Sequence, residues 1–389
     1  MSKLFFNNNN LALKIVSDKG SIDINNPSEI TYEDKIDRYR LEVSLLCDLK
    51  CQYCVVHMNK VAQQGMLMDM DTAKQIVCRF NNEVGKSGTL LLMGGEPLMN
   101  WSVVSFIVEN CIGHVMIFTN SYKLDMKKIE FLKDHDVMIL TSLDGYSLEQ
   151  NSARFYPDVQ RRFDIVTANI KNAINAKCKV GICCVVHQNN VDDLMGITKY
   201  FVEELGAISI SFAYPHYTAE KSATNSFSIV DYTNKLCEIW DYVKNNGVYV
   251  DQFGKKLNAI LSGQKVLCSC KVGVSQRTFY PDGSETQCTK LDTLKNYALN
   301  DFINHLPIKN NKCNGCIAQC VCGGGCPWDA AINSNDIGVD DRLCYYNRTL
   351  VKHILSDIQN EIKNIENLSK ARDIIYKIYN PLISPQWDN

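Results

Sequence analysis

Three cysteines stand close together near the start of the chain, at Cys47, Cys51 and Cys54, directly after an apolar stretch. Their spacing would place three thiolates on one short loop. A structural zinc site closes its shell with four protein ligands, whereas three ligands leave one metal position open for chemistry. Iron–sulfur clusters are normally held by four thiolates, so a cluster on three cysteines keeps one iron free to bind another molecule. The alternative is one buried face of a helix, because positions i, i+4 and i+7 share a side.

A second motif, Gly94-Gly95-Glu96-Pro97, follows the next apolar stretch. Paired glycines allow a backbone to approach a ligand closely and to adopt positive φ. The glutamate and the neighbouring carbonyl groups offer acceptors to an ammonium group. Taken alone, the motif is equally consistent with an ordinary turn between a strand and a helix.

Together, the two motifs resemble the radical S-adenosylmethionine (SAM) enzymes. In that family the free iron binds the amino and carboxylate groups of SAM, and a glycine-rich stretch holds the methionyl amine. The resemblance implies a [4Fe–4S] cluster on the three cysteines. It also implies that SAM contacts Tyr53, Gly94, Gly95, Glu96, Pro97, Asn120, Ser142, Arg154 and Val186. A surface position is the alternative for Arg154.

A third signal is a cysteine array in the C-terminal third, formed by Cys270, Cys288, Cys313, Cys316, Cys322, Cys326 and Cys344. The array resembles the SPASM extension of peptide-modifying radical SAM enzymes, which carries two auxiliary [4Fe–4S] clusters. By resemblance, Cys313, Cys316, Cys322 and Cys344 hold the outer cluster, and Cys270, Cys288 and Cys326 hold the inner one. A pair of zinc ribbons is the alternative.

The inner cluster has three assigned cysteines here, because the family's additional cysteine is missing between Lys271 and Gln287. Cys268 or the substrate could supply the fourth ligand, or one iron of this cluster could stay open. Cys320 has no assignment. The turn sequence Tyr280-Pro-Asp-Gly283 predicts a hairpin that brings Cys270 and Cys288 together.

Composition limits the remaining classes of protein. The chain has 389 residues, a net charge of −2 and no basic block, which argues against nucleic acid as a partner. It has neither an apolar run of about 20 residues nor a signal peptide, so we expect a cytoplasmic protein that does not bind membranes. Eighteen cysteines in such a protein favour metal sites over disulfides.

Strand-like and helix-like stretches alternate between residues 38 and 213, which predicts parallel βαβ units. Expected strands are Tyr39–Leu46, Thr89–Met93, Val115–Thr119, Val137–Ser142, Lys179–Val186 and Ile208–Ala213. Expected helices are Asp71–Val84, Trp101–Cys111, Met126–Asp134, Phe163–Ala176, Val191–Leu205, Tyr232–Asn245 and one from Tyr346 to Tyr379. Periodicity alone leaves a doubly wound sheet open. Either fold gathers reactive groups at the carboxyl ends of its strands.

We therefore predict an α/β fold, a partial (β/α)6 TIM-like barrel followed by a cysteine-rich auxiliary-cluster domain. The predicted segments are an N-terminal segment (1–37), the barrel (38–213), a connector (214–263), the SPASM domain (264–346) and a C-terminal helical segment (347–389).

The resemblance implies three [4Fe–4S] clusters and a SAM-derived 5′-deoxyadenosyl radical that abstracts a substrate hydrogen. We expect a ribosomally synthesised peptide as substrate, oxidised or crosslinked through a thioether or C–C bond, and an electron donor such as ferredoxin or flavodoxin. Sulfatase activation through formylglycine, small-molecule dehydrogenation and a non-catalytic metal-binding or electron-transfer protein are the alternatives. The sequence assigns no catalytic base.

Overall fold

The computed structural model describes residues 2–18, 20–28, 35–54, 56, 66–216, 227–294, 302–334, 338–363, 365 and 367–387. The chain divides into two compact units. The barrel unit comprises Asp34–Ser226 and Lys271–Tyr297, and the cysteine-rich unit comprises Met1–Glu33, Phe227–Cys270 and Ala298–Asn389.

Six parallel strands form the centre of the barrel unit, and each pairs with the next one along the chain. They are β4 (Arg38–Ser44), β5 (Thr89–Gly94), β6 (His114–Thr119), β7 (Met138–Ser142), β8 (Val180–Val185) and β9 (Ser209–Ala213). A doubly wound sheet reverses its strand order at a switch point, and this sheet does not. The predicted partial barrel is therefore confirmed.

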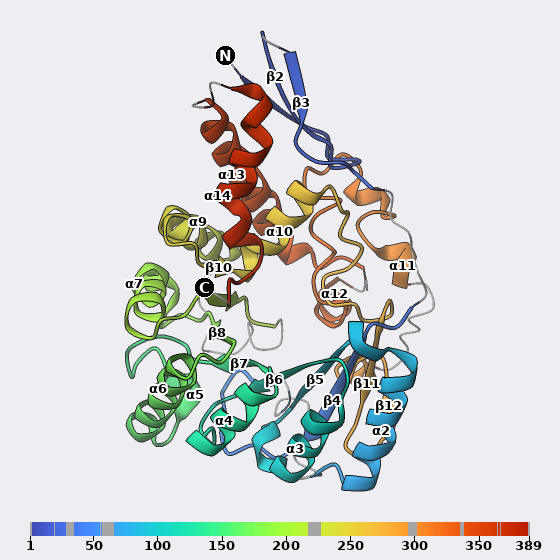
Figure 1. Ribbon diagram of the computed structural model, residues 1–389, viewed down its shortest axis with the longest axis vertical. Coiled ribbons are helices and arrows are strands. Elements are labelled where there is room, and N and C mark those ends of the chain that lie inside the picture. Colours follow the sequence, from blue (N-terminus) through green and yellow to red (C-terminus); the bar gives the residue numbers. More distant parts are fainter. Residues whose placement is uncertain are drawn as a thin grey trace. The chain divides into compact units, whose positions relative to one another are not determined.

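Helices connect these strands and cover one face of the sheet, as right-handed crossovers in an unbroken strand order require (Figure 1). They are α2 (Met70–Glu83), α3 (Trp101–Asn110), α4 (Met126–Asp134), α5 (Ser152–Phe155), α6 (Val159–Asn175) and α7 (Leu194–Lys199), which continues through a π turn over Tyr200–Glu204. The helices predicted in this region are confirmed, although α6 begins earlier than Phe163.

Successive side chains along each strand point to opposite sides, so the sheet has two different faces. Tyr39 and Leu41 of β4 point towards the helices, are fully buried and belong to a continuous apolar core. On the other face, Met116, Leu140 and Cys183 are only half-buried. The inner face of the partial barrel is therefore accessible to a ligand.

The packing of α2 against β4 predicts a large effect for Phe80. Its ring is fully buried and meets the Tyr39 ring edge-on, with 5.3 Å between the ring centroids. We expect Phe80→Ala to lower the free energy of unfolding by about 3–5 kcal/mol, because it removes buried surface and leaves a cavity. Cys78→Ala, at an exposed position of the same helix, should change it by no more than about 0.5 kcal/mol in the same thermal unfolding assay. Equal losses in the two variants would contradict this packing.

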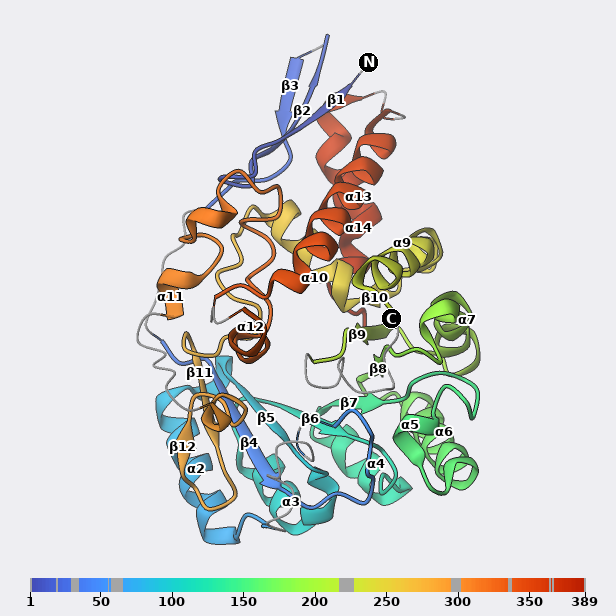
Figure 2. The ribbon, with the colours of Figure 1, turned by 180° about the vertical axis from the view of Figure 1, so that it is seen from behind.

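A hairpin extends the sheet beyond β4. It consists of β11 (Gln276–Phe279) and β12 (Glu285–Thr286), joined by a turn in which the Gly283 N–H donates to the Tyr280 carbonyl at 3.0 Å. The hairpin itself is confirmed, whereas its role in bringing Cys270 and Cys288 together stays a prediction. Its parallel pairing with β4 was not predicted, and Figure 2 shows both strands beside β4 and α2.

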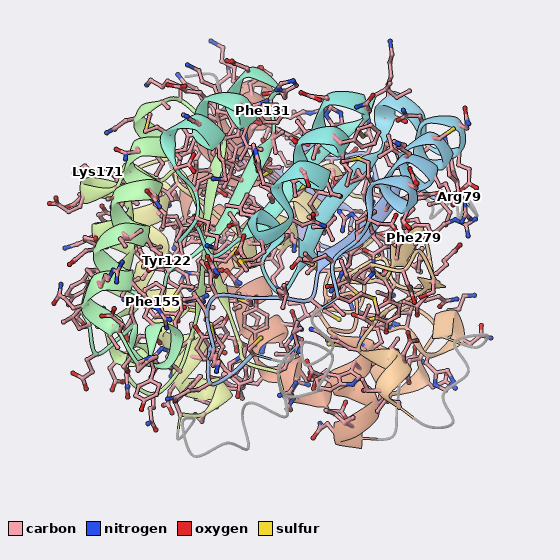
Figure 3. All side chains as sticks on the ribbon, turned by 90° about the horizontal axis from the view of Figure 1, so that it is seen from below. Arg79, Tyr122, Phe131, Phe155, Lys171 and Phe279 are labelled. Carbon is pink, nitrogen blue, oxygen red and sulfur yellow. The ribbon has the colours of Figure 1, made fainter. Side chains whose placement is uncertain are left out.

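Arg79 of α2 ties this hairpin to the barrel. Its guanidinium lies 2.8 Å from Glu285 and 5.6 Å from the centre of the Phe279 ring, and Figure 3 shows Arg79 and Phe279 side by side. The stretch Lys271–Tyr297, which contains Cys288, thus folds with the barrel strands.

The cysteine-rich unit is mainly helical. Its helices are α9 (Ile229–Asn245), α10 (Asp251–Ser262), α11 (Phe302–His305), α12 (Pro327–Ser334), α13 (Cys344–Lys363) and α14 (Ala371–Ile383). The indole of Trp240 packs against the rings of Phe253 and Tyr379, at centroid distances of 4.9 and 6.4 Å. Aromatic residues of α9, α10 and α14 therefore form its core.

Three features of this unit depart from the sequence prediction. The N-terminal segment forms an antiparallel sheet of β1 (Lys3–Phe6), β2 (Leu13–Ser17) and β3 (Gly20–Asp23). Helix α10 lies within the predicted connector, part of which, residues 217–226, is outside the described residues. The single helix predicted from Tyr346 to Tyr379 is wrong: the chain forms α13 and α14, and Asn367 caps a turn between them by accepting from the Ser369 N–H at 3.1 Å.

None of the helices in the described part of the chain has both the length and the apolar character needed to cross a membrane.

Candidate functional site

The loop that carries Cys47 begins where β4 ends, and the Gly94–Glu96 stretch lies directly against it. The N–H of Gly95 donates to the Ser44 carbonyl at 2.7 Å, and the N–H of Glu96 donates to the Leu46 carbonyl at 2.8 Å. A Cβ atom on Gly95 would stand 2.4 Å from the Leu46 oxygen, so only glycine permits this approach. The second motif therefore holds the start of the cysteine loop.

The three thiols of this loop are half-buried. Burial raises the pKa of the Cys47 thiol to about 12, and the nearby Glu96 and Cys51 contribute to this rise. Burial likewise raises the pKa of Cys51 to about 12, with a further contribution from Cys54. Such thiols stay protonated in water, but a coordinated metal deprotonates them. Three half-buried thiols on one short loop fit the cysteine set of an iron–sulfur cluster.

Hydrogen-bond donors surround the Cys47 sulfur. The Leu49 N–H lies 3.4 Å from Sγ and the Asn120 side-chain amide lies 3.7 Å from it. The same Asn120 amide donates to Asp48 at 2.8 Å. Donors to cysteine sulfur are among the features that tune iron–sulfur clusters, and they suit a thiolate at this position.

Glu96 is fully buried, and its carboxylate accepts three hydrogen bonds from the protein. The donors are the Leu98 N–H at 3.0 Å, the Thr119 hydroxyl at 2.8 Å and the Asn120 N–H at 2.7 Å. The side chain therefore joins the end of β5 to the end of β6. Its predicted role as an ammonium acceptor stays a prediction.

The burial of Glu96 predicts a pH dependence. Desolvation raises its pKa to about 7 despite the three donors. An acid with a raised folded-state pKa contributes stability at low pH that is lost as the pH rises, here between about 4.5 and 7. The loss should reach the order of 3 kcal/mol above pH 7. We expect the free energy of unfolding, measured by thermal unfolding at several pH values, to fall across this window in the wild type and to fall less in Glu96→Gln. Equal slopes in the two proteins would refute the raised pKa of Glu96.

Asp144, at the end of β7, forms a buried ion pair with Arg154 of α5. Its oxygens lie 3.0 Å from Nε and 2.9 Å from Nη2 of the guanidinium, and the side chains are 0% and 6% exposed. The Val185 N–H also donates to Asp144, at 2.9 Å. Arg154 is therefore not a surface arginine.

Tyr53, between the second and third cysteines, joins the Asp144–Arg154 ion pair. Its hydroxyl donates to Asp144, and the Arg154 guanidinium lies 5.5 Å from the centre of its ring. Next to it, the Gln52 N–H donates to the Ala153 carbonyl at 2.9 Å. The Asp144–Arg154 pair thereby fixes the cysteine loop to the ends of β7 and β8. Asp144 was not predicted as a site residue, although its place at a strand end could have indicated it.

The other predicted SAM contacts differ in accessibility. Gly94, Gly95 and Ser142 are half-buried, and Ser142 lies on the inner face of β7. Pro97 is buried at the start of a 3-10 turn (Pro97–Asn100). Val186 has no accessible surface, and its N–H donates to the Ala213 carbonyl at 3.0 Å. A direct contact of the Val186 side chain with a ligand would require movement.

Four cysteines of the C-terminal array gather within the cysteine-rich unit. Burial and the charges of Cys344 and Cys316 raise the pKa of the Cys313 thiol. Burial and the charges of Cys313 and Cys316 raise that of Cys322 to about 11. Cys313 therefore lies within electrostatic reach of the other three residues assigned by resemblance to the outer cluster, Cys316, Cys322 and Cys344.

The remaining cysteines of the array are distributed over both units. Cys270 and Cys326 belong to the cysteine-rich unit and Cys288 to the barrel unit, so their grouping around an inner cluster stays a prediction. Cys320, unassigned from the sequence, is buried, and its thiol donates to the Asn9 carbonyl at 3.4 Å. That contact gives Cys320 a role in packing the N-terminal segment.

Comparisons with known proteins agree with this geometry. The chain matches the Radical SAM superfamily model over residues 41–201. It is 23% identical over 317 residues to the cysteine-type anaerobic sulfatase-maturating enzyme of Clostridium novyi (strain NT), a match that covers 72% of this chain and 84% of the relative. It is 20% identical over 241 residues to the radical SAM cyclopropyl synthase TigE of Paramaledivibacter caminithermalis, covering 56% of this chain and 49% of that protein.

Two kinds of solved structure share the fold. Native anSMEcpe with bound AdoMet and the Cp18Cys peptide superposes with a TM-score of 0.67 at 21% identity, covering 85% of this chain and all of that chain (100%). Streptococcus suis SuiB bound to the precursor peptide SuiA gives a TM-score of 0.57 at 16% identity, covering 79% of this chain and 76% of that chain. Residues 41–201 therefore match the Radical SAM superfamily, and a cysteine-rich region follows the matched segment in a chain that shares its fold with anSMEcpe.

Proposed function

We propose that the protein is a peptide maturase of the radical SAM family. Bound SAM and the cluster supply a 5′-deoxyadenosyl radical that removes a hydrogen atom from the substrate. The substrate radical then loses one proton and one further electron, which an auxiliary cluster would accept, and a thioether or C–C crosslink or an oxidised residue results. The observation that carries the proposal is the convergence of Cys47, the Gly94–Glu96 stretch and the Asp144–Arg154 pair at one edge of a sheet with an accessible inner face.

In this scheme the chain's own residues bind the cluster and SAM and orient them. Cys47, Cys51 and Cys54 hold the cluster. We assign contacts with SAM to Tyr53, Gly94, Gly95, Glu96, Pro97, Asn120, Ser142, Arg154 and Val186. Because Arg154 is already paired with Asp144, its guanidinium has a fixed orientation, and an arginine in this state presents its remaining N–H donors with little entropy to lose.

We further propose two auxiliary [4Fe–4S] clusters in the region 264–346, which gives three clusters in all. The outer cluster uses Cys313, Cys316, Cys322 and Cys344, and the inner one uses Cys270, Cys288 and Cys326, with its fourth ligand from Cys268, the substrate or neither. A low-potential donor such as ferredoxin or flavodoxin supplies electrons. The cytoplasm, where such donors operate, is the proposed location.

A peptide substrate is supported by the relatives, since anSMEcpe and SuiB have both been solved with peptides. The test uses the reconstituted protein with SAM, a reductant and a short peptide encoded beside its gene. We expect 5′-deoxyadenosine together with a peptide that has lost two hydrogens, found by mass spectrometry. Deuterium transfer from the labelled peptide into 5′-deoxyadenosine would identify the attacked position. A peptide that stays unchanged while SAM is cleaved would contradict the maturase proposal.

Sulfatase activation is the second candidate, supported by the match to the Clostridium novyi enzyme over 84% of its length. A peptide from a sulfatase active site, containing the target cysteine, replaces the gene-neighbour peptide in the same assay. Formation of an aldehyde, trapped with a hydrazide, would favour this candidate. Its absence alongside crosslinking of the gene-neighbour peptide would favour maturation.

A further inference from the structure

A buried lysine lies inside the cysteine-rich unit. Lys256, in the middle of α10, is 7% exposed. Its ammonium donates to the Tyr346 hydroxyl at 3.2 Å and to the Gln252 carbonyl at 3.3 Å, and it lies 4.3 Å from the centre of the Tyr346 ring. Both oxygens that accept from it are neutral.

Lys256 has no carboxylate within ion-pair distance among the residues that the structure describes. Asp251, one turn earlier on α10, pairs instead with Lys255 at 2.8 Å and accepts from the Tyr249 hydroxyl at 2.9 Å. A buried, unneutralised ammonium costs several kcal/mol, so a compensating negative charge is expected close by.

The proposed outer cluster is that negative charge. Burial lowers the pKa of Lys256 to about 8, and the charge of Cys322 is the largest influence that raises it, so the ammonium and this thiolate lie within electrostatic reach. Tyr346, which the ammonium contacts, follows Cys344 by two residues. Lys256 thus contacts the first turn of α13, which begins at Cys344, and lies within electrostatic reach of Cys322.

We propose that Lys256 raises the reduction potential of the cluster held by Cys313, Cys316, Cys322 and Cys344. Reduction adds one electron, received from the substrate radical or the external donor, without making or breaking a bond in the cluster. A fixed positive charge in a low-dielectric interior favours the state with the additional negative charge. Lys256 therefore acts on electron transfer through its charge alone, without touching the substrate. This inference rests on the proposed cofactor set.

The experiment is a redox titration of the reconstituted full-length protein, followed by electron paramagnetic resonance, with the outer-cluster signal assigned by its loss in Cys322→Ala. Lys256→Met keeps the apolar stem and removes the charge. We expect it to shift the ratio of reduced to oxidised cluster about tenfold towards oxidised at a given potential, which corresponds to about 59 mV for one electron. Lys256→Arg should keep the wild-type midpoint.

Lys255→Met is the matched control, because it removes the same charge from the neighbouring position, where the side chain is 64% exposed. It should leave the midpoint unchanged. If Lys256→Met unfolds, Lys256→Gln, which keeps a polar group beside Tyr346, is titrated instead. An unchanged midpoint in the variant with full iron content would overturn the role of Lys256 while leaving the cofactor set intact. A wild-type protein whose iron content equals that of Cys322→Ala would overturn the outer cluster itself, and the inference with it.

Discussion

A Cys51→Ala variant is expected to produce no 5′-deoxyadenosine above the level of a reaction without protein. Cys51 is the middle thiol of the loop, and its sulfur lies within electrostatic reach of Cys54 on one side and contributes to the raised pKa of Cys47 on the other. Removing it leaves two thiolates, too few to retain a cluster that normally needs three or four. The measurement is chromatographic detection of 5′-deoxyadenosine after anaerobic reconstitution and reduction with dithionite.

Cys184→Ala is the control for this variant. Cys184 lies in β8 of the same unit, is fully buried, and its sulfur accepts from the Asn190 amide at 3.6 Å. Its loss should cost some stability through a small cavity but leave SAM cleavage close to the wild-type rate. Cleavage that survives in Cys51→Ala, or that disappears equally in Cys184→Ala, would show that the opening loop does not hold the catalytic cluster.

An Asp144→Asn variant should lose about 3–5 kcal/mol of stability, because it leaves the Arg154 guanidinium buried without its counter-ion. The pair is 0% and 6% exposed and joined by two hydrogen bonds, so water cannot replace the lost carboxylate. The same change releases the Tyr53 hydroxyl, and with it one tie of the cysteine loop. We therefore expect weaker SAM binding together with the lower melting temperature.

The exposed pair Asp136–Lys179 provides a matched comparison. Its atoms approach to 2.6 Å, but the side chains are 71% and 31% exposed, so Asp136→Asn should cost no more than about 1 kcal/mol. Asparagine also tolerates the positive φ of 54° at this position. In a double-mutant cycle, Asp144→Asn with Arg154→Met should cost less than the sum of the single changes. Additive losses would mean that the two side chains are not coupled.

The parallel strands and their helices were predictable because each carries its own periodic signal. Buried strands such as Thr89–Gly94 appear as short apolar runs, and α4 (Met126–Asp134) repeats its apolar residues with helical spacing. The positions of Cys47 and of Gly94–Pro97 at strand ends followed from the same signals, since the carboxyl ends of parallel strands share one edge.

The features missed from the sequence depend on contacts between distant segments. The strand Gln276–Phe279 pairs with Arg38–Leu41, more than two hundred positions away, and no local pattern specifies that partner. The break between α13 and α14 depends on a cap at Asn367 within an otherwise helical apolar pattern. The role of Asp144 required knowing that Arg154 folds back onto it, which a spacing of ten residues does not reveal.

The most direct test of the central claim is the electron paramagnetic resonance spectrum of the reduced, reconstituted protein before and after SAM is added. A cluster with an open iron that binds SAM should change its signal on addition, and that component should be missing in Cys51→Ala. Iron analysis of the same sample should give about twelve irons per chain for three [4Fe–4S] clusters. Zinc with little iron, or an iron–sulfur spectrum that SAM leaves unchanged, would contradict the account.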